Sequence, residues 1–456
     1  MKNKCAAVIL AAGEGTRMKS KTPKVLHEIA GRSMLEWVLH ASAGADTQKC
    51  IVVCGHGGDQ LKEKFGDALL FAEQAERKGS GHAVMCAAHL LDGFDGYTLI
   101  IAGDMPLLRQ QTVAAMVKAA EEGNYACTML TAELDDPYGY GRILRNEMGD
   151  VVAIVEEKDA TDEQRAVHEV NASCYCVCTP LLLECLNELK PANTQGEYYL
   201  TDIVGILNAK GEKVGAYIAR DARECMGVND RAQLALCAEI LRGRIADEHL
   251  KNGVSMVDPK TVYIDADVQI GRDSVIYPNV TLERGCVIGE DVLLYPGSRI
   301  ANSEIGSGTT VQNSVILDAK IGENTTVGPY AYVRPGSDIG DKCRIGDFVE
   351  VKNSNIGDGT KVSHLTYIGD ADFGERINVG CGVVVVNYDG KKKFRTTVGD
   401  DAFIGCNTNL VSPVNVGKET YIAAGSTITE DIPDKAFAIA RSRQTVKTGW
   451  TDKRKR

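Results

Sequence analysis

A chain of 456 residues is too long for one ordinary hydrophobic core, so we expect two or three domains. The hydrophobic fraction of 44% and the charged fraction of 25% are those of a soluble globular protein. A formal net charge of −11 argues against a general affinity for nucleic acid, but it allows small basic pockets that bind phosphate groups.

The first apolar run, Cys5 to Ala12, follows two lysines and in that respect looks like a short secretory signal peptide. The run continues into a glycine-rich segment, Gly13 to Arg17, and no cleavage site intervenes. A buried first strand of an α/β domain explains this order better. No other stretch is long enough to span a membrane, so we expect no membrane association.

The 15 cysteines are scattered along the chain, and none forms a CxxC pair of the kind that holds zinc. Cys174, Cys176 and Cys178 alternate, so in a strand they would share one face. A disulfide framework would be denser and would occupy a smaller domain. We therefore expect a cytoplasmic protein that uses cysteine as a small hydrophobe.

Short apolar runs alternate with helical patterns through residues 1–229. Strands are predicted at Ala6–Leu10, Cys50–Cys54, Tyr97–Ala102 and Cys127–Thr131. Helices are predicted at Met34–Ala43, Gly81–Leu91 and Gln111–Glu122. The alternation predicts an α/β domain with a mostly parallel, Rossmann-like sheet that helices cover on both faces.

Residues 230–252 carry the 3.6-residue period of a single helix, and Gly253 follows as a stop signal. The apolar stripe consists of Leu234, Cys237, Leu241 and Ile245. We expect a linker helix between an N-terminal domain at 1–229 and a C-terminal domain at 253–446.

Beyond Gly253 an aliphatic residue recurs every six positions and is often followed by glycine. This regularity is the signature of a β-solenoid, in which each coil buries its aliphatic side chains against its neighbours. One insertion interrupts it, Val386 to Thr397, and the basic tail at 447–456 is expected to be disordered. The aliphatic positions begin at Ile264, Ile270, Ile276, Leu282, Ile288, Leu294 and Ile300, and after a one-residue slip resume at Ile305, Val311 and Leu317.

A glycine-rich turn follows the first predicted strand and contains Gly13, Gly15 and Arg17. Backbone N–H groups in such a turn can approach a phosphate chain closely, and Arg17 and Lys24 supply positive charge for a triphosphate. The turn is not a dinucleotide fingerprint, because Met18 stands where a third glycine belongs. It is not a Walker A loop either, because no GK[ST] follows.

Asp104 lies at the carboxyl end of the strand predicted at Tyr97–Ala102. Aspartate after glycine is often only a turn residue. The end of a central strand is, however, where α/β domains bind ligands, which favours a functional role for Asp104.

A β-helix needs no basic side chains for its stability, so those in the C-terminal half are candidate functional residues. His364 is the only one of the eight histidines beyond Gly253. Each coil takes three hexads, so positions 18 apart stack on one another. Arg334 and Lys352 are 18 apart, and we expect them to form a basic ladder for a sugar phosphate.

The order of motifs resembles the nucleotidylyltransferases that join a sugar 1-phosphate to a nucleoside triphosphate. It is most similar to the family of bifunctional N-acetylglucosamine-1-phosphate uridylyltransferases/glucosamine-1-phosphate acetyltransferases, from about Ala6 to about Gln444. The resemblance implies a left-handed parallel β-helix for the hexapeptide repeats. The motifs are LAAGEGTRM at 10–18, PKVL at 23–26, QAE at 74–76, GSGH at 79–82, GDMPL at 103–107, GYGR at 139–142, VEEKD at 155–159, QGEYY at 195–199 and GVN at 227–229.

The resemblance also implies roles in the N-terminal half, with Arg17 and Lys24 as catalytic residues and Mg2+ on Asp104 and Asn229. The sugar phosphate would attack the α-phosphorus of UTP in line, and pyrophosphate would leave. The residues implied in binding UTP or the sugar-nucleotide product are Leu10, Ala11, Ala12, Gly13, Lys24, Gln74, Gly79, Ser80, Ala102, Gly103, Asp104, Gly141, Glu156, Asn171 and Asn229.

Three positions depart from the family pattern. Glu14 stands where Lys or Gln is frequent, Ser80 replaces a frequent Thr, and Ala172-Ser173 stand where Thr-Gly is usual. We expect Glu14 to repel a triphosphate unless its side chain points to water. These departures bear on affinity and leave the expected reaction unchanged.

For the C-terminal half the resemblance implies an acetyl-CoA-dependent acetyltransferase with His364 as general base. An imidazole suits this role, because a protonated amine cannot attack a thioester. Glucosamine 1-phosphate would bind Arg334, Lys352, Tyr367 and Asn378. Acetyl-CoA would bind Cys381, Asn387, Tyr388, Cys406, Ala424 and Arg441.

At the level of the whole protein, the resemblance implies a homotrimer with the acetyl site between neighbouring chains. The product would be UDP-N-acetylglucosamine, a precursor of peptidoglycan and lipopolysaccharide. Three other functions compete with this one: a single-function pyrophosphorylase whose β-helix only regulates or oligomerises, a β-helix zinc enzyme of the carbonic anhydrase kind, and a non-enzymatic scaffold. The zinc enzyme would need three histidines where this half offers one.

Overall fold

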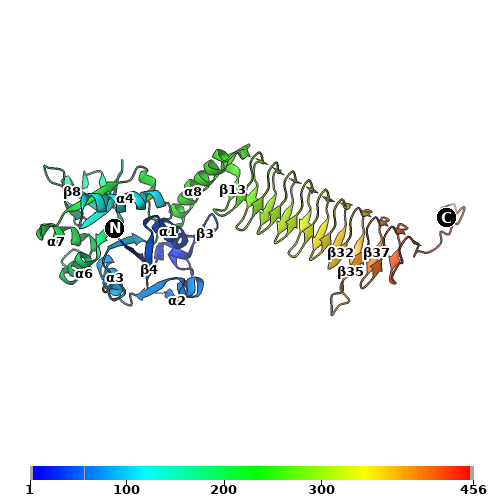
Figure 1. Cartoon of the computed structure of the whole chain (residues 1–456), viewed down its shortest axis with the longest axis horizontal. Helices are drawn as coiled ribbons and strands as arrows, with labels where there is room; N and C mark the ends of the chain where they lie inside the picture. The colour runs from blue at the N-terminus through cyan, green and yellow to red at the C-terminus, as the bar shows by residue number, and fades with distance from the viewer. Residues whose placement is uncertain (1–3, 56, 452–456) are drawn as a thin grey trace. The chain divides into compact units, whose positions relative to one another are not determined.

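The computed structural model describes residues 4–55 and 57–451 (Figure 1). The chain divides into two compact units, Met1–Leu241 and Arg242–Arg456, and each is described by itself. The division falls inside helix α8, Arg231–Lys251, which is the single long helix that the sequence predicts at 230–252. The exact limits of the two functional domains stay a prediction.

The first unit is built around one nine-stranded sheet, with the main order β11-β7-β10-β6-β1-β4-β5. The strands β1, β4, β5 and β6 are parallel, as are β7 and β11, whereas β10 runs antiparallel to β6 and β7. The mostly parallel sheet is therefore confirmed. Its strands are β1 Cys5–Ala11, β4 Thr47–Cys54, β5 Leu70–Glu73, β6 Tyr97–Ala102, β7 Cys127–Glu133, β8 Arg142–Arg145, β9 Val151–Val155, β10 Glu169–Cys178 and β11 Val214–Ile218.

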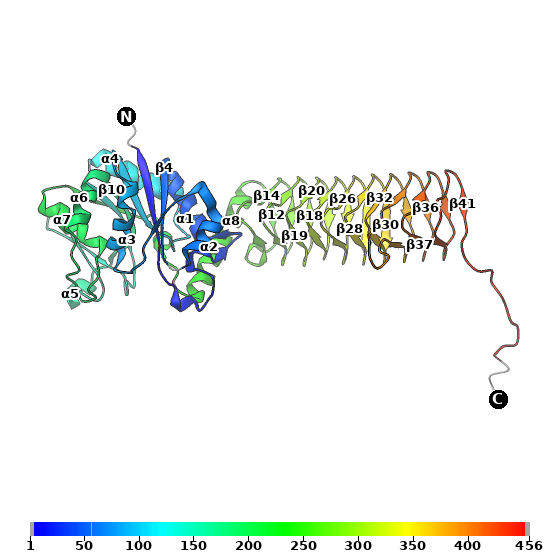
Figure 2. The same cartoon turned by 90° about the horizontal axis from the view of Figure 1, so that it is seen from below.

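Helices cover both faces of this sheet (Figure 2). The alternation along β10 shows the two faces: Cys174 and Cys176 pack with helices α1 and α4, while Tyr175 and Val177 pack with α3, α6 and α7. The shared face predicted for the cysteines is confirmed, with Cys178 partly buried against the same cluster. The helices are α1 Met34–Ser42, α2 Gly58–Phe65, α3 Ser80–Ala87, α4 Gln110–Gly123, α5 Asp162–Arg165, α6 Thr179–Glu188 and α7 Ile203–Ala209.

The predicted strands and helices all exist, and their ends differ by a few residues. The largest difference is in the helix expected over Gly81–Leu91, which ends at Ala87 and continues as a 3-10 turn, Ala88–Leu90. The first apolar run forms β1, the buried central strand, as expected.

Strand β1 lies between β4 on one side and β6 on the other. The segment after β1 therefore continues to β4 on one side of β1, whereas the later strand β6 lies on the other side. Such a reversal opens a crevice at the carboxyl ends of the strands, where α/β sheets bind ligands. Leu10 pairs with Ala102 at this edge, so the glycine-rich turn and Asp104 both lie at the crevice.

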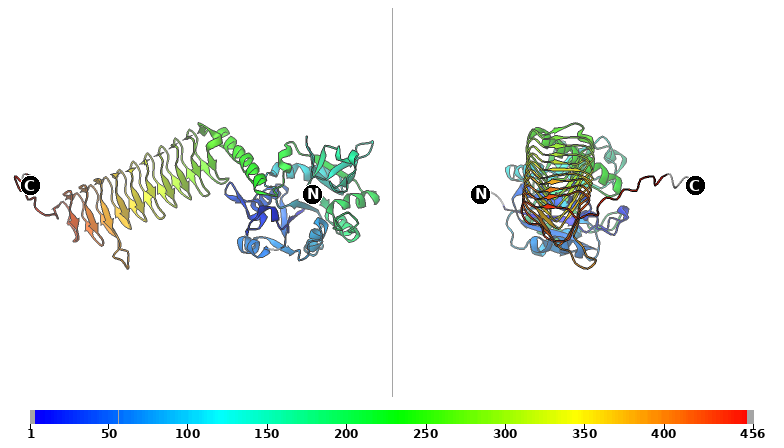
Figure 3. Two further views of the ribbon diagram at one scale, coloured as in Figure 1. Left: turned by 180° about the vertical axis from the view of Figure 1, so that it is seen from behind. Right: turned by 90° about the vertical axis from the view of Figure 1, so that its right-hand side faces the viewer.

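The second unit is a β-helix of stacked coils, each with three short strands (Figure 3). The strands form three parallel sheets of 11, 10 and 9 strands, which begin at β12 Ser255–Met256, β13 Tyr263–Ile264 and β14 Gln269–Ile270. Ile264 pairs with Leu282, one full coil of 18 residues later. The parallel β-helix predicted from the hexads is confirmed.

One position of the hexad prediction is wrong. Ile316, and not Leu317, belongs to the buried column: it is 0% exposed and pairs with Ile300 below and Val333 above. Leu317 is only partly buried. Because side chains alternate between the two faces of a strand, the one-residue shortening of this coil moves Ile316 inward.

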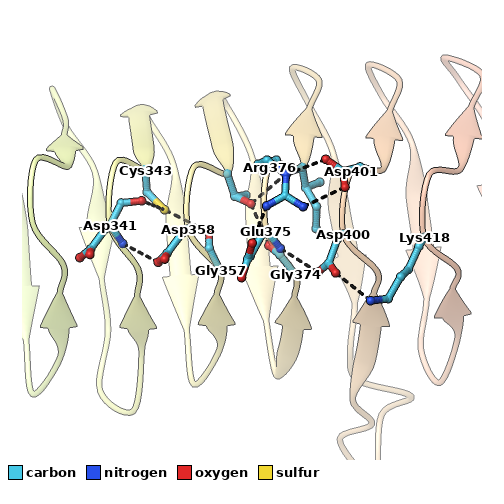
Figure 4. A network of polar contacts seen from close by, with 12 residues as sticks. Asp341, Cys343, Gly357, Asp358, Gly374, Glu375, Arg376, Asp400, Asp401 and Lys418 are labelled. Carbon is cyan, nitrogen blue, oxygen red and sulfur yellow. Dashed lines mark hydrogen bonds and ion pairs between the residues drawn. The ribbon is translucent and has the colours of Figure 1, made fainter.

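Acidic side chains fix the stacking at one corner of the coils (Figure 4). The Asp358 carboxylate accepts a hydrogen bond from the backbone N–H of Asp341 at 2.8 Å, and Asp400 accepts one from Glu375 at 3.1 Å. Asp400 also pairs with Lys418 at 2.8 Å. The first two bonds give backbone N–H groups at the corner an acceptor, and all three contacts join a coil to its neighbour.

The insertion forms a loop that projects between β34, Val384–Val386, and β35, Thr396–Val398 (Figure 1). Part of the tail predicted to be disordered, residues 452–456, lies outside the described residues. Every cysteine lies within the described residues, and none is in a disulfide. Over the same residues, no helix combines the length and the apolar character needed to cross a bilayer.

Candidate active sites

At the crevice of the first unit, Lys24 forms an ion pair with Asp104. The two side chains are 12% and 20% exposed, so the pair is largely sheltered from water. Gly15 makes the close approach of the glycine-rich turn to Lys24 possible. Its φ is +61°, and a Cβ there would lie 2.7 Å from Lys24 Cβ.

A second contact joins the same turn to the segment before α8. Arg17 Nη2 donates to Asn229 Oδ1 at 2.9 Å, and the backbone N–H of Val228 donates to the Asp104 carbonyl at 2.9 Å. The structure thus brings together the four residues expected to act on the triphosphate and the metal: Arg17, Lys24, Asp104 and Asn229.

The expected metal ligands, Asp104 and Asn229, offer one carboxylate and one amide oxygen. Among the described residues, no group of three or more His, Cys, Asp or Glu side chains could hold a metal ion. A cation at this crevice would therefore take most of its ligands from phosphate and water. That donor set fits Mg2+, a hard cation that keeps few protein ligands.

Gln74, Gly79 and Ser80 form a second group of expected residues, between the carboxyl end of β5 and the start of α3. Gln74 Nε2 donates to the Gly79 carbonyl at 3.0 Å, and Ser80 Oγ accepts from the Leu200 N–H at 3.0 Å. Gly79 has a φ of +105°, and a Cβ there would lie 2.5 Å from the Tyr198 carbonyl oxygen. Only glycine fits this turn without strain, so the GSGH motif has a local structural cause.

Three of the residues expected to bind UTP or the sugar-nucleotide product, Gly141, Glu156 and Asn171, also come together. Asn171 N–H donates to the Gly141 carbonyl at 2.8 Å, and a Cβ on Gly141 would lie 3.4 Å from Glu156 Oε1. Burial raises the pKa of Glu156, whose carboxylate accepts a long hydrogen bond of 3.5 Å from the Thr201 hydroxyl.

Two of the three departures from the family pattern have a structural account. Glu14 forms an ion pair with Arg77, which compensates the charge that would repel a triphosphate. Ser173 has a φ of +52°, the conformation that a glycine adopts easily, and its N–H donates to Asn171 Oδ1 at 3.2 Å. Serine thus keeps the backbone conformation at a position where glycine is usual.

In the β-helix, His364 Nδ1 lies 2.6 Å from Asp347 Oδ1. The two residues are paired between β27, Arg344–Asp347, and β30, Lys361–His364. The hydrogen bond from His364 lowers the pKa of the Asp347 carboxyl. Sequence reasoning missed Asp347, although its spacing of 17 residues from His364, about one coil, was a usable signal.

The basic ladder exists, but each cation has an acidic partner. Val333 pairs with Val351, so Arg334 and Lys352 occupy matching positions of successive coils, as predicted. Arg334 Nη1 lies 2.7 Å from Glu350, and Lys352 Nζ lies 3.7 Å from Asp370. Neither carboxylate was identified from the sequence.

Asp370 connects the ladder to the projecting loop. Its carboxylate accepts hydrogen bonds from Asn353 at 2.6 Å and from Asn387 at 2.5 Å. Asn387 Nδ2 also donates to the Tyr367 hydroxyl at 3.4 Å. Two residues expected to bind different substrates, Tyr367 and Asn387, thus belong to one network around a carboxylate that is 8% exposed.

Three of the residues expected to bind acetyl-CoA lie in line with His364. The Gly382 N–H donates to the His364 carbonyl at 3.4 Å, the Asn407 N–H to the Cys381 carbonyl at 2.8 Å, and the Gly425 N–H to the Cys406 carbonyl at 2.8 Å. The register of β33 (Asn378–Val379), β36 (Phe403–Ile404) and β39 (Tyr421–Ile422) continues this line to Ala424. The members of this column, in order, are His364, Cys381, Cys406 and Ala424.

The remaining expected residues lie around this column. Asn378 begins β33, Asn378–Val379, in the same sheet as His364. A Cβ on Gly425 would lie 3.9 Å from Arg441 Cδ. Tyr388 is 56% exposed on the projecting loop, where its hydroxyl donates to the Gly390 carbonyl at 2.7 Å.

Family comparisons match both halves of the chain. Residues 7–169 match the family described as MobA-like NTP transferase domain. Residues 318–353 match the family described as bacterial transferase hexapeptide (six repeats), and residues 395–430 match the hexapeptide repeat of succinyl-transferase.

Relatives with the name Bifunctional protein GlmU match almost the whole chain. The protein of Acetivibrio thermocellus is 52% identical over 448 residues, which cover 98% of this chain and 97% of the relative. The protein of Clostridium acetobutylicum is 51% identical over 452 residues, or 99% of each chain. The protein of Brevibacillus brevis is 49% identical over 451 residues, or 99% and 98%.

Proposed function

Since the chain belongs to the family of bifunctional GlmU proteins, we infer a separate activity for each half. The enzyme is a uridylyltransferase and a glucosamine-1-phosphate acetyltransferase of UDP-N-acetylglucosamine synthesis. The assignment of residues rests on two separate polar pairs. These are Lys24–Asp104 in the first unit and Asp347–His364 in the second.

For acetyl transfer, we propose that Arg334 and Lys352 bind the phosphate of glucosamine 1-phosphate, helped by Tyr367 and Asn378. The hydrogen bond from Nδ1 to Asp347 leaves His364 Nε2 to take a proton from the substrate amine. The amine then attacks the acetyl thioester, and coenzyme A leaves. The cofactor would lie along Cys381, Cys406 and Ala424, with Asn387, Tyr388 and Arg441 around it.

For uridylyl transfer, the glycine-rich turn from Leu10 to Gly13 would hold the nucleotide, and Gln74, Gly79 and Ser80 would face the uracil. Arg17 and Lys24 would neutralise the charge that develops as pyrophosphate leaves. Asp104 and Asn229 would hold Mg2+, which when bound neutralises phosphate oxygens. Ala102 and Gly103 would complete the nucleotide wall.

The sugar phosphate would bind in the first unit against Gly141, Glu156 and Asn171. These residues form one cluster, and within residues 4–55 and 57–451 no cation pairs with Glu156, so its carboxylate is available for sugar hydroxyl groups. The phosphate of the bound sugar would then attack the α-phosphorus of UTP in line.

We further propose a cytoplasmic homotrimer whose product supplies peptidoglycan and lipopolysaccharide precursors. Both co-substrates of the proposed reactions, UTP and acetyl-CoA, are present in the cytoplasm. At the corner next to His364, exposed Tyr330, Phe348 and Leu365 form an apolar column, with the Tyr330 and Phe348 rings stacked at 5.4 Å. A second copy of the chain would cover this column and complete the acetyl site.

A coupled assay with glucosamine 1-phosphate, acetyl-CoA, UTP and Mg2+ tests the assignment. We expect UDP-N-acetylglucosamine from the full mixture. Without acetyl-CoA, the coupled reactions should stop before N-acetylglucosamine 1-phosphate forms. Without UTP, they should stop after that intermediate has formed. Release of pyrophosphate without acetyl transfer would instead indicate a single-function pyrophosphorylase, and a scaffold would give neither product. Light scattering of the same sample tests the trimer.

A further inference from the structure

The side-chain amide of Gln74 is held in one orientation. Its Nε2 donates to the Gly79 carbonyl at 3.0 Å, and a carbonyl oxygen can only accept, so the amide nitrogen must lie on that side. The same Nε2 lies 3.1 Å from His82 Nδ1. Because the amide is the donor, His82 Nδ1 must be the acceptor, and the ring carries its proton on Nε2.

His82 is placed for this contact by helix α3, which begins one residue after Gly79. The thiol of Cys86, one helical turn further on, lies 4.0 Å from His82 Nδ1. A thiol is a weak donor, so this neighbour also suits an unprotonated Nδ1. The His82 ring lies 6.3 Å from that of Tyr198, which packs against the same turn.

With both hydrogens of its amide engaged, Gln74 can offer only Oε1 to a ligand. Within residues 4–55 and 57–451, this oxygen has no hydrogen-bond partner, although Gln74 is 4% exposed. Among the described residues, the fully buried side-chain atoms without a hydrogen-bond partner do not include this oxygen, so it is open to solvent or to a donor of the ligand. The amide therefore presents a fixed acceptor to whatever base lies against it.

We propose that His82 is a positioning residue for base selection in the uridylyltransferase site, an inference that rests on the proposed binding of uracil at Gln74. Uracil carries an N3–H donor that fits the Gln74 Oε1 acceptor. Cytosine carries a lone pair on N3, which would face the same oxygen and be repelled. By holding the amide, His82 prevents the rotation that would offer cytosine an N–H.

Two variants of nearly equal shape test this role. His82→Asn places an oxygen near the position of Nδ1 and keeps an acceptor, whereas His82→Leu removes it. We measure kcat/KM of the full-length enzyme with UTP and with CTP. His82→Leu should lower the UTP-to-CTP ratio by about 3- to 10-fold, the loss of one hydrogen bond, while His82→Asn keeps it within about 2-fold. Near-ultraviolet circular dichroism of the same samples reports on folding of the first unit, where His82 lies, and should not change.

A ratio that is unchanged in His82→Leu, or lowered equally in both variants, would overturn the positioning role. In either case His82 would only pack against α3 and Tyr198. Failure of the proposed function looks different, because the unmodified enzyme would then show no transfer from UTP at all.

Discussion

The two candidate sites are assembled in opposite ways. In the first unit, Arg17 and Asn229 are 212 positions apart in the sequence, and the crossover of strands around β1 brings them together. In the β-helix, His364 and Asp347 are only 17 positions apart, and the stacking of coils brings them together. A sheet edge thus collects distant segments, whereas a solenoid repeats local ones.

The sites also differ in how far one chain encloses them. The Lys24 and Asp104 side chains are 12% and 20% exposed, but the His364 side chain is 51% exposed. A proposed general base that is so open to water on one chain has no means to exclude water from the thioester. The difference supports a site in the first unit that is complete in one chain and a site in the β-helix that needs a second one.

The largest effect is expected from Asp104→Ala, which separates the two sites most sharply. The variant loses a proposed metal ligand and leaves Lys24 without its partner. Uridylyl transfer should fall by about 10⁴-fold, while acetyl transfer stays near normal. The two half-reactions are measured separately on one sample. An equal loss of both activities in a folded variant would contradict the independence of the sites.

The reverse experiment is His364→Ala, which should lower acetyl transfer by about 10²–10³-fold and spare uridylyl transfer. Glucosamine's amine is largely protonated at neutral pH, and His364 is the only histidine beyond Gly253. Acetyl-CoA binding, followed by calorimetry, should change little. Near-normal turnover would show that His364 is only a surface residue of its coil.

The comparison explains what could be predicted from the sequence. The hexad alone places Arg334 and Lys352 in matching positions, because coil length sets the register between successive coils. The prediction for Leu317 is wrong, because the spacing from Val311 to the next buried position is five residues. Ile316 and Leu317 are both aliphatic, so the sequence does not show which of them is buried. Local spacing thus predicts a solenoid well, and it fails where the coil length changes.

The ion partners were harder to predict. Nothing in a single sequence distinguishes Asp370 or Glu350 from the other acidic residues of the repeats, because their role depends on which coil lies next to theirs. In the first unit, the pairing of Glu14 with Arg77 depends on a turn and a strand end that only the folded sheet brings together. Roles in the first unit therefore came from the resemblance to a family, and the structure supplies their contacts.

A smaller effect is expected from Asp347, the partner of the proposed general base His364. Asp347→Ala removes both the charge and the acceptor that orient His364, and should lower the kcat of acetyl transfer by about 10-fold. Asp347→Asn keeps an acceptor oxygen and should lose only about 3-fold. KM for acetyl-CoA should stay the same in both. Equal losses in the two variants would show that charge, and not orientation, is what Asp347 contributes.

The smallest effect concerns stability, and it compares two neighbouring acids of the first unit. Burial raises the pKa of Glu156, so between its unfolded and folded values the folded state binds more protons, and stability falls as pH rises. Glu156→Gln removes the buried charge and should therefore raise the Tm by about 1–3 °C at neutral pH while it weakens binding of the sugar phosphate. The charge of Glu157 has the opposite effect on stability, because hydrogen bonds from the Gly139 N–H and from the Arg142 guanidinium lower the pKa of its carboxyl.

Glu157→Gln should therefore lower the Tm, since Glu157 contributes stability above its unfolded pKa and its partner Arg142 is only 2% exposed. Calorimetry of the full chain measures both variants in the transition that UTP raises, because a ligand stabilises the unit that binds it. If Glu156→Gln also lowers the Tm at pH 7, the carboxylate has a stabilising partner in the folded protein. In that case Glu156 is a structural residue, and its place in the sugar site has to be given up.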